Sequence, residues 1–217
     1  MTTPVVLFDF DGTLVRGDSV GGYLLRHLLR RGLLRRAVAL LGLPLFAPLF
    51  LWWRSAFIAA GFYGWLGSVG RSDAWLAAAR DRWLADCVGR RDQLLIAPAL
   101  ARMHKHLARG ERVIIVTGAE TGLARALWAV LGGPDVEFIG STVRRGFGGR
   151  VPVEHVIGPR KLTALARLGL QAPFAAMYSD SARDLPLLRA AQRAVMVEPR
   201  GTHLRRVQRF IPAVEVL

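Results

Sequence analysis

The sequence has a single cysteine, few acidic residues and almost no lysine. Cys87 alone cannot form an internal disulfide framework or a metal cage made only of thiolates. The chain has 16 acidic and 30 basic residues, which gives a formal net charge of +14. Lys105 and Lys161 are the only lysines. Arginine abundance of this kind indicates a compositional bias, whereas the position of each lysine is informative. Hydrophobic residues make up 52% of the 217 residues, which excludes a disordered chain and suffices for one domain with an insertion.

Short apolar runs alternate with stretches of helical periodicity along most of the chain. This alternation predicts an α/β fold around a parallel sheet. The expected strands cover residues 4–8, 112–117, 136–139, 142–145, 150–153, 174–178 and 194–197, and the expected helices cover residues 18–31, 94–109, 121–131, 161–168 and 183–191. Residues 1–10 carry no basic segment and no small-residue cleavage site, so we expect no secretory signal.

An apolar segment interrupts this pattern over residues 37–70, where Arg54 is the only charged residue. Its two halves would each extend about 25 Å as helices, slightly short of a hydrocarbon core of about 30 Å. Together they predict a hairpin that dips into or crosses a bilayer, with Trp52, Trp53 and Arg54 at its tip. The arginines before it predict a basic collar for anionic head groups. That collar consists of Arg26, Arg30, Arg31, Arg35 and Arg36.

Two carboxylates follow the first apolar run, within the hexapeptide Asp9–Leu14. Open α/β sheets place their ligands at this end of a strand. These carboxylates are Asp9 and Asp11, and Gly12 beside them supplies the freedom for the backbone to bend. The alternative interpretation is a glycine turn with two solvated carboxylates, which a lone Asp-Gly would favour.

Three later segments place polar groups at corresponding positions. Thr117 and Gly118 end the second long apolar strand, where a threonine alone would usually be only a cap. Lys161 begins a helix, where a lone lysine would usually be solvated. Asp180 follows a third apolar strand, and Asp184 lies in the first turn of the next helix, where a carboxylate also stabilises a helix N-terminus.

The order of these four segments resembles the haloacid dehalogenase (HAD) superfamily of phosphatases over most of the chain. The match covers Asp9–Leu14, Thr117, Lys161 and Asp180 with Asp184, although Ser179 stands where glycine is commoner. The resemblance implies a Rossmann-like core made of residues 1–17 and 92–217. Residues 18–91 would form a helical cap that contains the apolar hairpin 37–70.

The resemblance also implies a role for each motif residue. Asp9 would attack phosphorus to form an aspartyl-phosphate, and Asp11 would act as general acid and then as general base. Mg²⁺ would offset the repulsion between the two anions, held by Asp9, Asp180 and the Asp11 main-chain carbonyl. Asp184 would orient Lys161 or a metal-bound water. The substrate phosphate would be bound by Thr117, Gly118 and Lys161.

Four features are similar to bacterial phosphatidylglycerophosphatases of the phosphoserine-phosphatase-like branch: the arginine-rich first helix, the apolar insertion before Gly64, the hairpin around Phe147 and the stretch Tyr178–Ser181. This resemblance predicts an enzyme that dephosphorylates phosphatidylglycerophosphate, an anionic phospholipid, in phosphatidylglycerol biosynthesis. Because Asp9 precedes the insertion and Lys161 follows it, both flanks must lie on one side of the membrane. Flanking arginines then place the catalytic core on the cytoplasmic surface of a bacterial inner membrane.

The sequence leaves alternatives open. The enzyme would instead hydrolyse small soluble monoesters such as phosphoserine if the insertion were merely the core of a cap. A third alternative is a membrane-bound binding protein that kept the fold but lost catalysis. The complete set of motif residues argues against it. No nucleic-acid partner is expected, because the densest arginines adjoin the apolar insertion rather than interleaved aromatics. The oligomeric state is left open.

Other polar residues carry no functional prediction. Cys87 is expected to be a small core residue, and the two histidines beside Lys105 are expected to be solvated, namely His104 and His106. The remaining histidines lack partners at metal-ligand spacing: His27, His155 and His203. The arginines of the hairpin 142–153 would either hold an anionic head group or be solvated turn charges; these are Arg144, Arg145 and Arg150.

Overall fold

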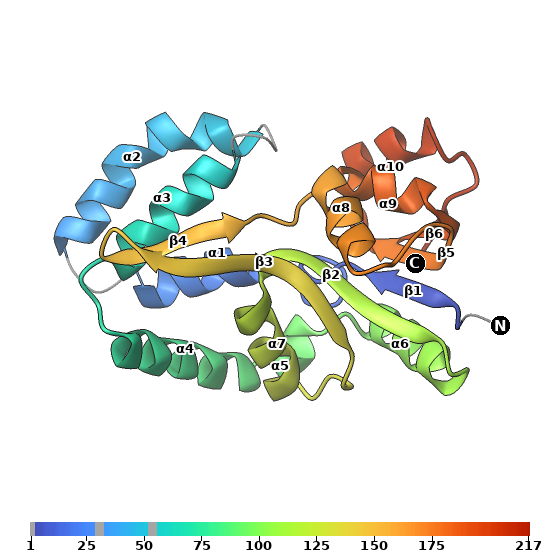
Figure 1. Cartoon of the computed structure of the whole chain (residues 1–217), viewed down its shortest axis with the longest axis horizontal. Coiled ribbons are helices and arrows are strands. Elements are labelled where there is room, and N and C mark those ends of the chain that lie inside the picture. Colours follow the sequence, from blue (N-terminus) through green and yellow to red (C-terminus); the bar gives the residue numbers. More distant parts are fainter. Residues whose placement is uncertain (1–2, 29–32, 52–55) are drawn as a thin grey trace.

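The computed structural model describes residues 3–28, 33–51 and 56–217, which fold around a twisted seven-stranded sheet (Figure 1). The strand order is β4-β3-β2-β1-β5-β6-β7, and every neighbouring pair is parallel except β3 and β4. The strands are β1 Val5–Phe8, β2 Arg112–Glu120, β3 Glu137–Gly146, β4 Gly149–Glu154, β5 Phe174–Ser179, β6 Ala191–Met196 and β7 Glu215–Val216. The predicted α/β fold with a mostly parallel, Rossmann-like sheet is confirmed.

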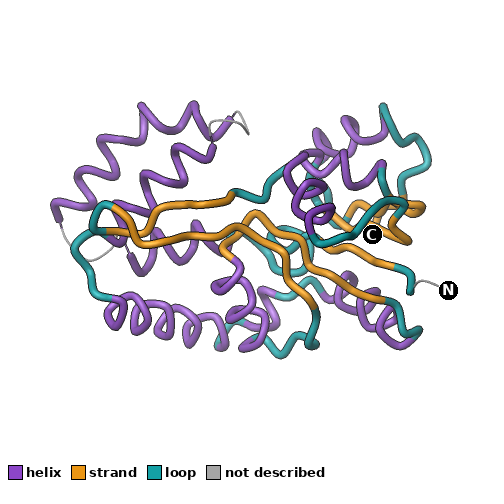
Figure 2. The backbone as a smooth tube through the Cα atoms, viewed as in Figure 1, coloured by secondary structure: helices purple, strands orange, loops and turns teal. Residues whose placement is uncertain are grey.

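Helices cover both faces of this sheet (Figure 2). Val6 and Phe8 of β1 face one hydrophobic layer and Leu7 faces the other, because successive strand residues point to opposite faces. The first layer, which includes Cys87 as predicted, packs against α4, α6 and α7, and the second packs against α8, α9 and α10. These helices are α4 Asp73–Val88, α6 Ala97–Ala108, α7 Thr121–Val130, α8 Pro159–Arg167, α9 Leu185–Arg189 and α10 Gly201–Gln208. Because helices cover both faces of the sheet, a ligand-binding site is expected at the ends of the strands.

Within the segment between β1 and β2, the helices from α1 to α4 are here called the cap. Besides α4 it contains α1 Ser19–Tyr23, a π-helical turn Leu24–Leu28, α2 Leu33–Leu51 and α3 Ala56–Ser68, and the short helix α5 Arg91–Leu94 leads from it to α6. The antiparallel pair α2 and α3 lies at one end of the molecule, where the Tyr63 hydroxyl donates to the Ala39 carbonyl over 3.3 Å (Figure 1). Within the three described ranges, no helix has both the length and the apolar composition that crossing a bilayer requires, so the predicted membrane hairpin finds no support. Its expected tip, residues 52–54, lies outside the described residues.

One arginine of the predicted collar is part of the internal structure of the cap. Arg35 donates from its two terminal nitrogens to the carbonyls of Leu66 and Val69, each over 2.6 Å, where α3 ends. Carbonyls at the end of a helix lack partners within that helix, and one guanidinium group satisfies two of them at once. Arg35 is thus occupied within the protein, and Arg30 and Arg31 lie outside the described residues.

The hairpin of β3 and β4 is fastened to the cap. The Trp65 indole nitrogen of α3 donates over 2.8 Å to the Phe147 carbonyl at the tip of the hairpin. Arg145 and Arg150 donate over 2.9 and 2.7 Å to the same carboxylate oxygen of Asp73, the first residue of α4. The two arginines are exposed, as expected for turn charges, and in addition they link the hairpin to the cap.

The single strand β3 replaces the two strands expected over residues 136–139 and 142–145. Gly140 separates those two segments in the sequence but does not break the strand. A Cβ at this position would lie 2.9 Å from the Ala119 carbonyl oxygen of β2. The glycine therefore serves the close approach of two strands rather than a turn.

His106 is buried, contrary to the expectation that it is solvated. One ring nitrogen pairs with the Glu111 carboxylate, and Nε2 lies 2.8 Å from the Tyr178 hydroxyl of β5. Since Tyr178 is 72 residues away in the sequence, local periodicity did not indicate this contact.

Candidate active site

Lys161 lies at the centre of a buried cluster of charged groups. Its ammonium donates over 2.7 Å to Asp9 Oδ1 and over 2.8 Å to Asp184 Oδ2. Asp9 directly follows β1, Lys161 is in the first turn of α8, and Asp184 ends a short 3₁₀ turn, Ala182–Asp184. Because β1 and β5 are parallel neighbours, the loops that follow them meet at one edge of the sheet.

Burial governs the ionisation of Asp9. Its pKa is raised to about 8, chiefly because burial removes water, while the Lys161 ammonium opposes this and the Asp184 and Asp180 carboxylates add to it. The pKa of Lys161 is raised although burial disfavours its charge, because Asp184 and Asp9 both stabilise the ammonium. Full ionisation of Asp9 near neutral pH therefore calls for a further positive charge beside it.

Asp11 is held by the start of α1. The main-chain nitrogen and the hydroxyl of Ser19 donate to its two carboxylate oxygens, each over 3.0 Å. Burial, followed by repulsion from Asp18, raises the pKa of Asp11 to about 7 against the effect of these hydrogen bonds. A carboxyl group that titrates near neutrality is suited to both giving and taking a proton.

The loop after β1 bends against the loop after β5 at Gly12. Its φ of +78° lies in the left-handed region, and a Cβ there would lie 2.5 Å from Asp180 Oδ2. Both the backbone conformation and the available space thus require glycine. The Asp180 main-chain nitrogen donates over 3.0 Å to the Thr13 hydroxyl, which ties the two loops together. Burial, with repulsion from Asp184, raises the pKa of Asp180 as well.

Thr117 and Gly118 lie within β2 rather than at its end, because the strand continues to Glu120. Thr117 is buried, and its hydroxyl accepts a hydrogen bond from the Ala119 main-chain nitrogen over 3.0 Å. Ser141 donates to the Gly118 carbonyl over 2.7 Å. Since β2 pairs with β1, both residues lie on the strand beside Asp9, although no hydrogen bond joins Thr117 to the Lys161 cluster in the described part of the chain.

Sequence reasoning missed three neighbours of the motif residues. The Ser179 hydroxyl donates over 2.9 Å to Asp184 Oδ2, so the serine that replaces a commoner glycine supports Asp184. Ser19, the first residue of α1, holds Asp11 through its main-chain nitrogen and its hydroxyl. His203 Nδ1 lies 3.3 Å from the Asp180 carbonyl oxygen, a contact that no local pattern signals because α10 begins far downstream.

The oxygen donors of this site fit Mg²⁺. The carboxylates of Asp9 and Asp180 and the main-chain carbonyl of Asp11 are hard ligands, and Mg²⁺ commonly takes one or two protein carboxylates and keeps several waters. Both carboxylates have raised pKa values, so a divalent cation would stabilise their ionised forms. Across the described ranges no group of three or more His, Cys, Asp or Glu side chains is arranged to hold a metal.

Carboxylates and a buried lysine thus meet at one edge of a parallel sheet, where open α/β folds place their active sites. The chain belongs to the haloacid dehalogenase-like hydrolase family, whose sequence model matches residues 6–189. The predicted superfamily and the prediction of an enzyme are confirmed. The finer resemblance to phosphatidylglycerophosphatases is not shown.

Solved structures share the fold over nearly the whole chain. A protein of unknown function from Bordetella pertussis Tohama I is 25% identical with a TM-score of 0.73, covering 100% of this chain and 99% of that one. Phosphoserine phosphatase in its apo form is 13% identical with a TM-score of 0.60, covering 99% and 100%. A HAD-family hydrolase from Salmonella enterica serovar Typhi is 16% identical with a TM-score of 0.63, covering 99% and 68%.

Proposed function

We propose that the chain hydrolyses phosphate monoesters through a covalent phosphate on Asp9. The observation that carries this proposal is the buried Lys161 ammonium, 2.7 Å from Asp9 Oδ1 and neutralised on its other side by Asp184. A fixed cation beside the attacking carboxylate is suited to hold phosphate oxygens as charge develops on them. A phospho-aspartyl intermediate analogue solved for phosphoserine phosphatase, which shares this fold, supports the same chemistry.

Proton transfer falls to Asp11. In its protonated form it donates to the departing alkoxide, and in its ionised form it takes a proton from the water that hydrolyses the aspartyl-phosphate. A pKa raised to about 7 allows both forms near neutral pH. The two hydrogen bonds from Ser19 fix the direction of the carboxyl group through both steps.

Substrate binding falls to Lys161 together with Thr117 and Gly118, which β2 places beside β1. When bound at Asp9, Asp180 and the Asp11 carbonyl, Mg²⁺ would reduce the repulsion between the phosphate dianion and the attacking carboxylate. Asp184 acts on the substrate only through Lys161, whose ammonium it orients.

Phosphate release from a panel of lipid and soluble monoesters, with Mg²⁺ and with EDTA, tests this function. Asp9→Asn should abolish turnover, because the amide is neither a nucleophile nor a full metal ligand. A radiolabelled substrate should leave acid-stable label on the native chain and none on Asp9→Asn. Substantial turnover by a folded Asp9→Asn protein would refute the covalent mechanism.

Small soluble monoesters such as phosphoserine are the substrate class that we propose first. Phosphoserine phosphatase, itself of this fold, supports the class. The helical insertion also has a small core of its own, made of Ala39, Tyr63 and Leu66, as a cap over a soluble substrate would need. In this proposal residues 18–91 form the cap and residues 1–17 and 92–217 form the catalytic core.

One specific observation favours a second candidate, phosphatidylglycerophosphate at the surface of a bacterial inner membrane. Leu34, Leu41 and Leu45 of α2 are 78%, 78% and 71% exposed, and their spacing places them on one side of the helix. An exposed apolar face of this kind is suited to the boundary between head groups and acyl chains.

A double variant with serine in place of Leu34 and Leu41 distinguishes the lipid substrate from the soluble substrate. If the lipid is the substrate, Leu34→Ser with Leu41→Ser should lower hydrolysis of vesicle-borne phosphatidylglycerophosphate and leave aryl phosphate hydrolysis unchanged. If the substrate is soluble, the double variant should match the native protein on every monoester of the panel, and neither protein should sediment with vesicles.

A further inference from the structure

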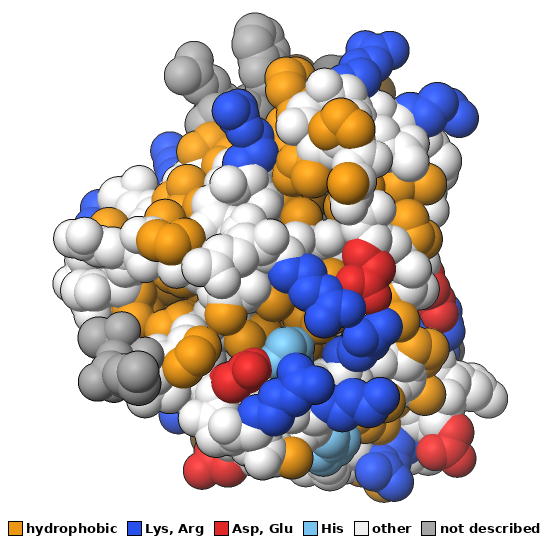
Figure 3. All heavy atoms as spheres, turned by 90° about the vertical axis from the view of Figure 1, so that its right-hand side faces the viewer, with side chains coloured by type: hydrophobic (Ala, Val, Ile, Leu, Met, Phe, Trp, Pro, Cys, Tyr) orange, Lys and Arg blue, Asp and Glu red, His pale blue; other side chains and the backbone are white. Residues whose placement is uncertain are grey.

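A basic surface lies on the side of the molecule away from α2 and α3. Figure 3 looks at this side, and Lys and Arg side chains gather across it with exposed hydrophobic side chains between them. α9, α10 and the segment that leads from α10 to β7 form part of this side (Figure 1). None of these elements supplies a residue of the phosphatase site except His203, through its contact with the Asp180 carbonyl.

A hollow of about 510 Å³ lies along the exposed face of α10. Positions 202, 205, 206 and 209 recur at intervals of three and four residues, so their side chains share one side of the helix. As far as the described residues show, no carboxylate lines the hollow. Its lining consists of Leu185, Thr202, Arg205, Arg206, Arg209 and Phe210.

Three guanidinium groups within five residues repel one another unless an anion lies between them. Arg205, Arg206 and Arg209 are all exposed, and their planar groups match phosphate oxygens with paired hydrogen bonds. Elsewhere in the described chain many arginines pair with carboxylates, such as Arg112 with Glu137 and Arg16 with Glu198. The α10 cluster therefore offers its charge to something outside the chain.

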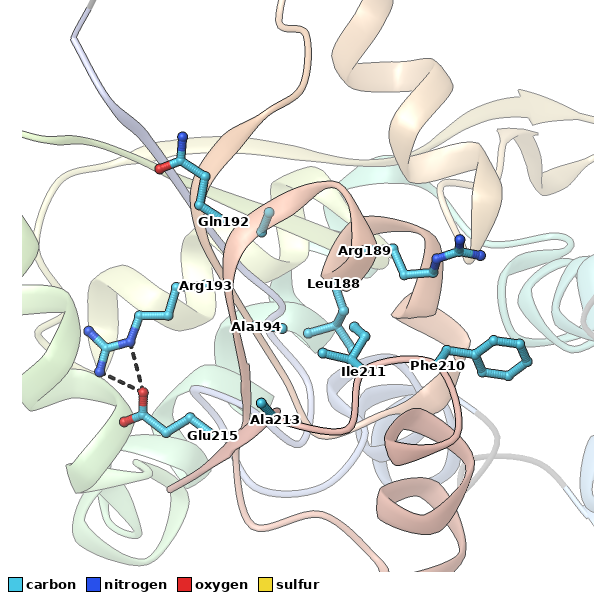
Figure 4. Close-up of a pocket in the computed structure, with 10 residues that line it drawn as sticks. Leu188, Arg189, Gln192, Arg193, Ala194, Phe210, Ile211, Ala213 and Glu215 are labelled. Carbon is cyan, nitrogen blue, oxygen red and sulfur yellow. Dashed lines mark hydrogen bonds and ion pairs between the residues drawn. The ribbon is translucent and has the colours of Figure 1, made fainter.

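A second hollow, of about 420 Å³, adjoins the first at Phe210, which lines both. Figure 4 shows Leu188 and Ile211 at its centre, with Arg189 and Phe210 to one side and the Arg193–Glu215 ion pair to the other. Glu215 is neutralised by that pair, so it does not oppose an anion. Phe210 is 55% exposed, and its ring is available to a flat group.

We propose that this surface binds a nucleoside polyphosphate. Arg205, Arg206 and Arg209 hold the phosphates, and the base lies against Phe210 and the apolar floor beside Ile211. Stacking on an aromatic ring stabilises every type of base, and charge-assisted hydrogen bonds from arginine stabilise the phosphates. Inorganic phosphate or pyrophosphate would use only the arginines, so the exposed ring points to a ligand with a base.

The test measures binding of a non-hydrolysable ATP analogue and of tripolyphosphate to the full chain by calorimetry in EDTA. Arg205→Gln with Arg209→Gln should weaken binding of both ligands about tenfold or more. The control carries Arg82→Gln with Arg109→Gln, which removes the same net charge from exposed positions outside the surface and should change either affinity by less than about twofold. Both double variants should retain the phosphatase activity of the native chain.

Phe210→Ala tests the base. It should weaken binding of the ATP analogue several-fold, since base–aromatic stacking is worth about 1–3 kcal/mol, and leave tripolyphosphate unchanged. Equal loss of affinity in both double variants would overturn the proposal, because net charge alone would then explain binding. So would an ATP analogue that does not bind, or one whose affinity is unaffected by Phe210→Ala.

Discussion

Lys161 Nζ lies 2.7 Å from Asp9 Oδ1, although 152 residues separate the two in the sequence. The same ammonium is 2.8 Å from Asp184 Oδ2, so one cation stands between two buried carboxylates that would otherwise repel each other. Removing one partner of a buried ion pair leaves an uncompensated charge, which costs far more than breaking a pair at the surface. The contact therefore links the chemistry of this site to the stability of the fold.

Lys161→Met should impair both activity and stability. We expect the free energy of unfolding to fall by about 3 kcal/mol or more, because Asp9 and Asp184 lose their shared partner. Phosphoryl transfer should slow strongly because the variant lacks the ammonium group that would hold the phosphate oxygens. Urea denaturation and phosphate release measure the two effects. Lys105→Met, which changes the other lysine on the exposed side of α6, is the control and should leave both near native values. A Lys161→Met protein with native activity would show that the site is assigned wrongly.

Asp11→Asn should discriminate between substrates by their leaving groups. An alkyl phosphate needs a proton on the departing oxygen, so its turnover should fall by about 10²–10⁴-fold. An aryl phosphate with an acidic phenol leaves without that help, and its first step should be affected much less. Burst kinetics then separate formation of the aspartyl-phosphate from its hydrolysis. Equal losses on both substrates in both steps would exclude Asp11 as the general acid.

The stability of the metal-free chain should fall as pH rises. The pKa of Asp9 is about 8 in the folded chain against an ordinary value of 3.8, and the pKa of Asp11 is raised to about 7, so the folded state binds more protons between these limits. Stability from this source is therefore greatest near pH 4 and is lost progressively toward about pH 8. Lys161 stays protonated throughout, while Asp180 and Asp184 add repulsion.

Mg²⁺ should reverse that loss. Because a metal binds the ionised carboxylate, it should raise the melting temperature more near pH 8 than near pH 6. Thermal melts with Mg²⁺ and with EDTA at both pH values measure the difference. Asp9→Asn should remove the part of the pH dependence that lies above about pH 7 and most of the Mg²⁺ effect, while the part due to Asp11 remains. A Mg²⁺ effect that is independent of pH would contradict metal binding at Asp9.

Gly149→Ala should loosen the attachment of the hairpin to the cap. A Cβ at Gly149 would lie 2.9 Å from Trp65 Cδ1 and 3.1 Å from Ser68 Oγ, so α3 would have to shift. We expect the free energy of unfolding to fall by about 1–3 kcal/mol and proteolysis within the cap to accelerate. Gly64→Ala, whose Cβ would meet only the Arg150 carbonyl oxygen at 3.9 Å, should be neutral or slightly stabilising. Identical behaviour of the two variants would mean that this packing does not hold the cap in place.

Strand and helix periodicity in the sequence predicted most of the core. The apolar runs that end at Phe8, Thr117 and Tyr178 mark three adjacent parallel strands, because alternation and burial leave a local signature in the sequence. The positions of Asp9, Lys161 and Asp180 relative to those elements were equally visible. Local patterns were misleading around Gly140. They predict two strands, one on each side of this glycine, whereas the structure has a single strand whose glycine allows the close approach of β2.

The sequence by itself thus determined the α/β class, the family and the motif residues, since these depend on local patterns and on their order along the chain. Only the tertiary structure decided which further groups hold them: Ser19 on Asp11, Ser179 on Asp184, and Lys161 on Asp9 in addition to Asp184, the partner that the resemblance implied. It also assigned Arg35, Arg145 and Arg150 to the cap and the hairpin. The physical reason is that hydrogen bonds and buried ion pairs depend on distances of about 3 Å between segments that the chain brings together only when its hydrophobic layers close.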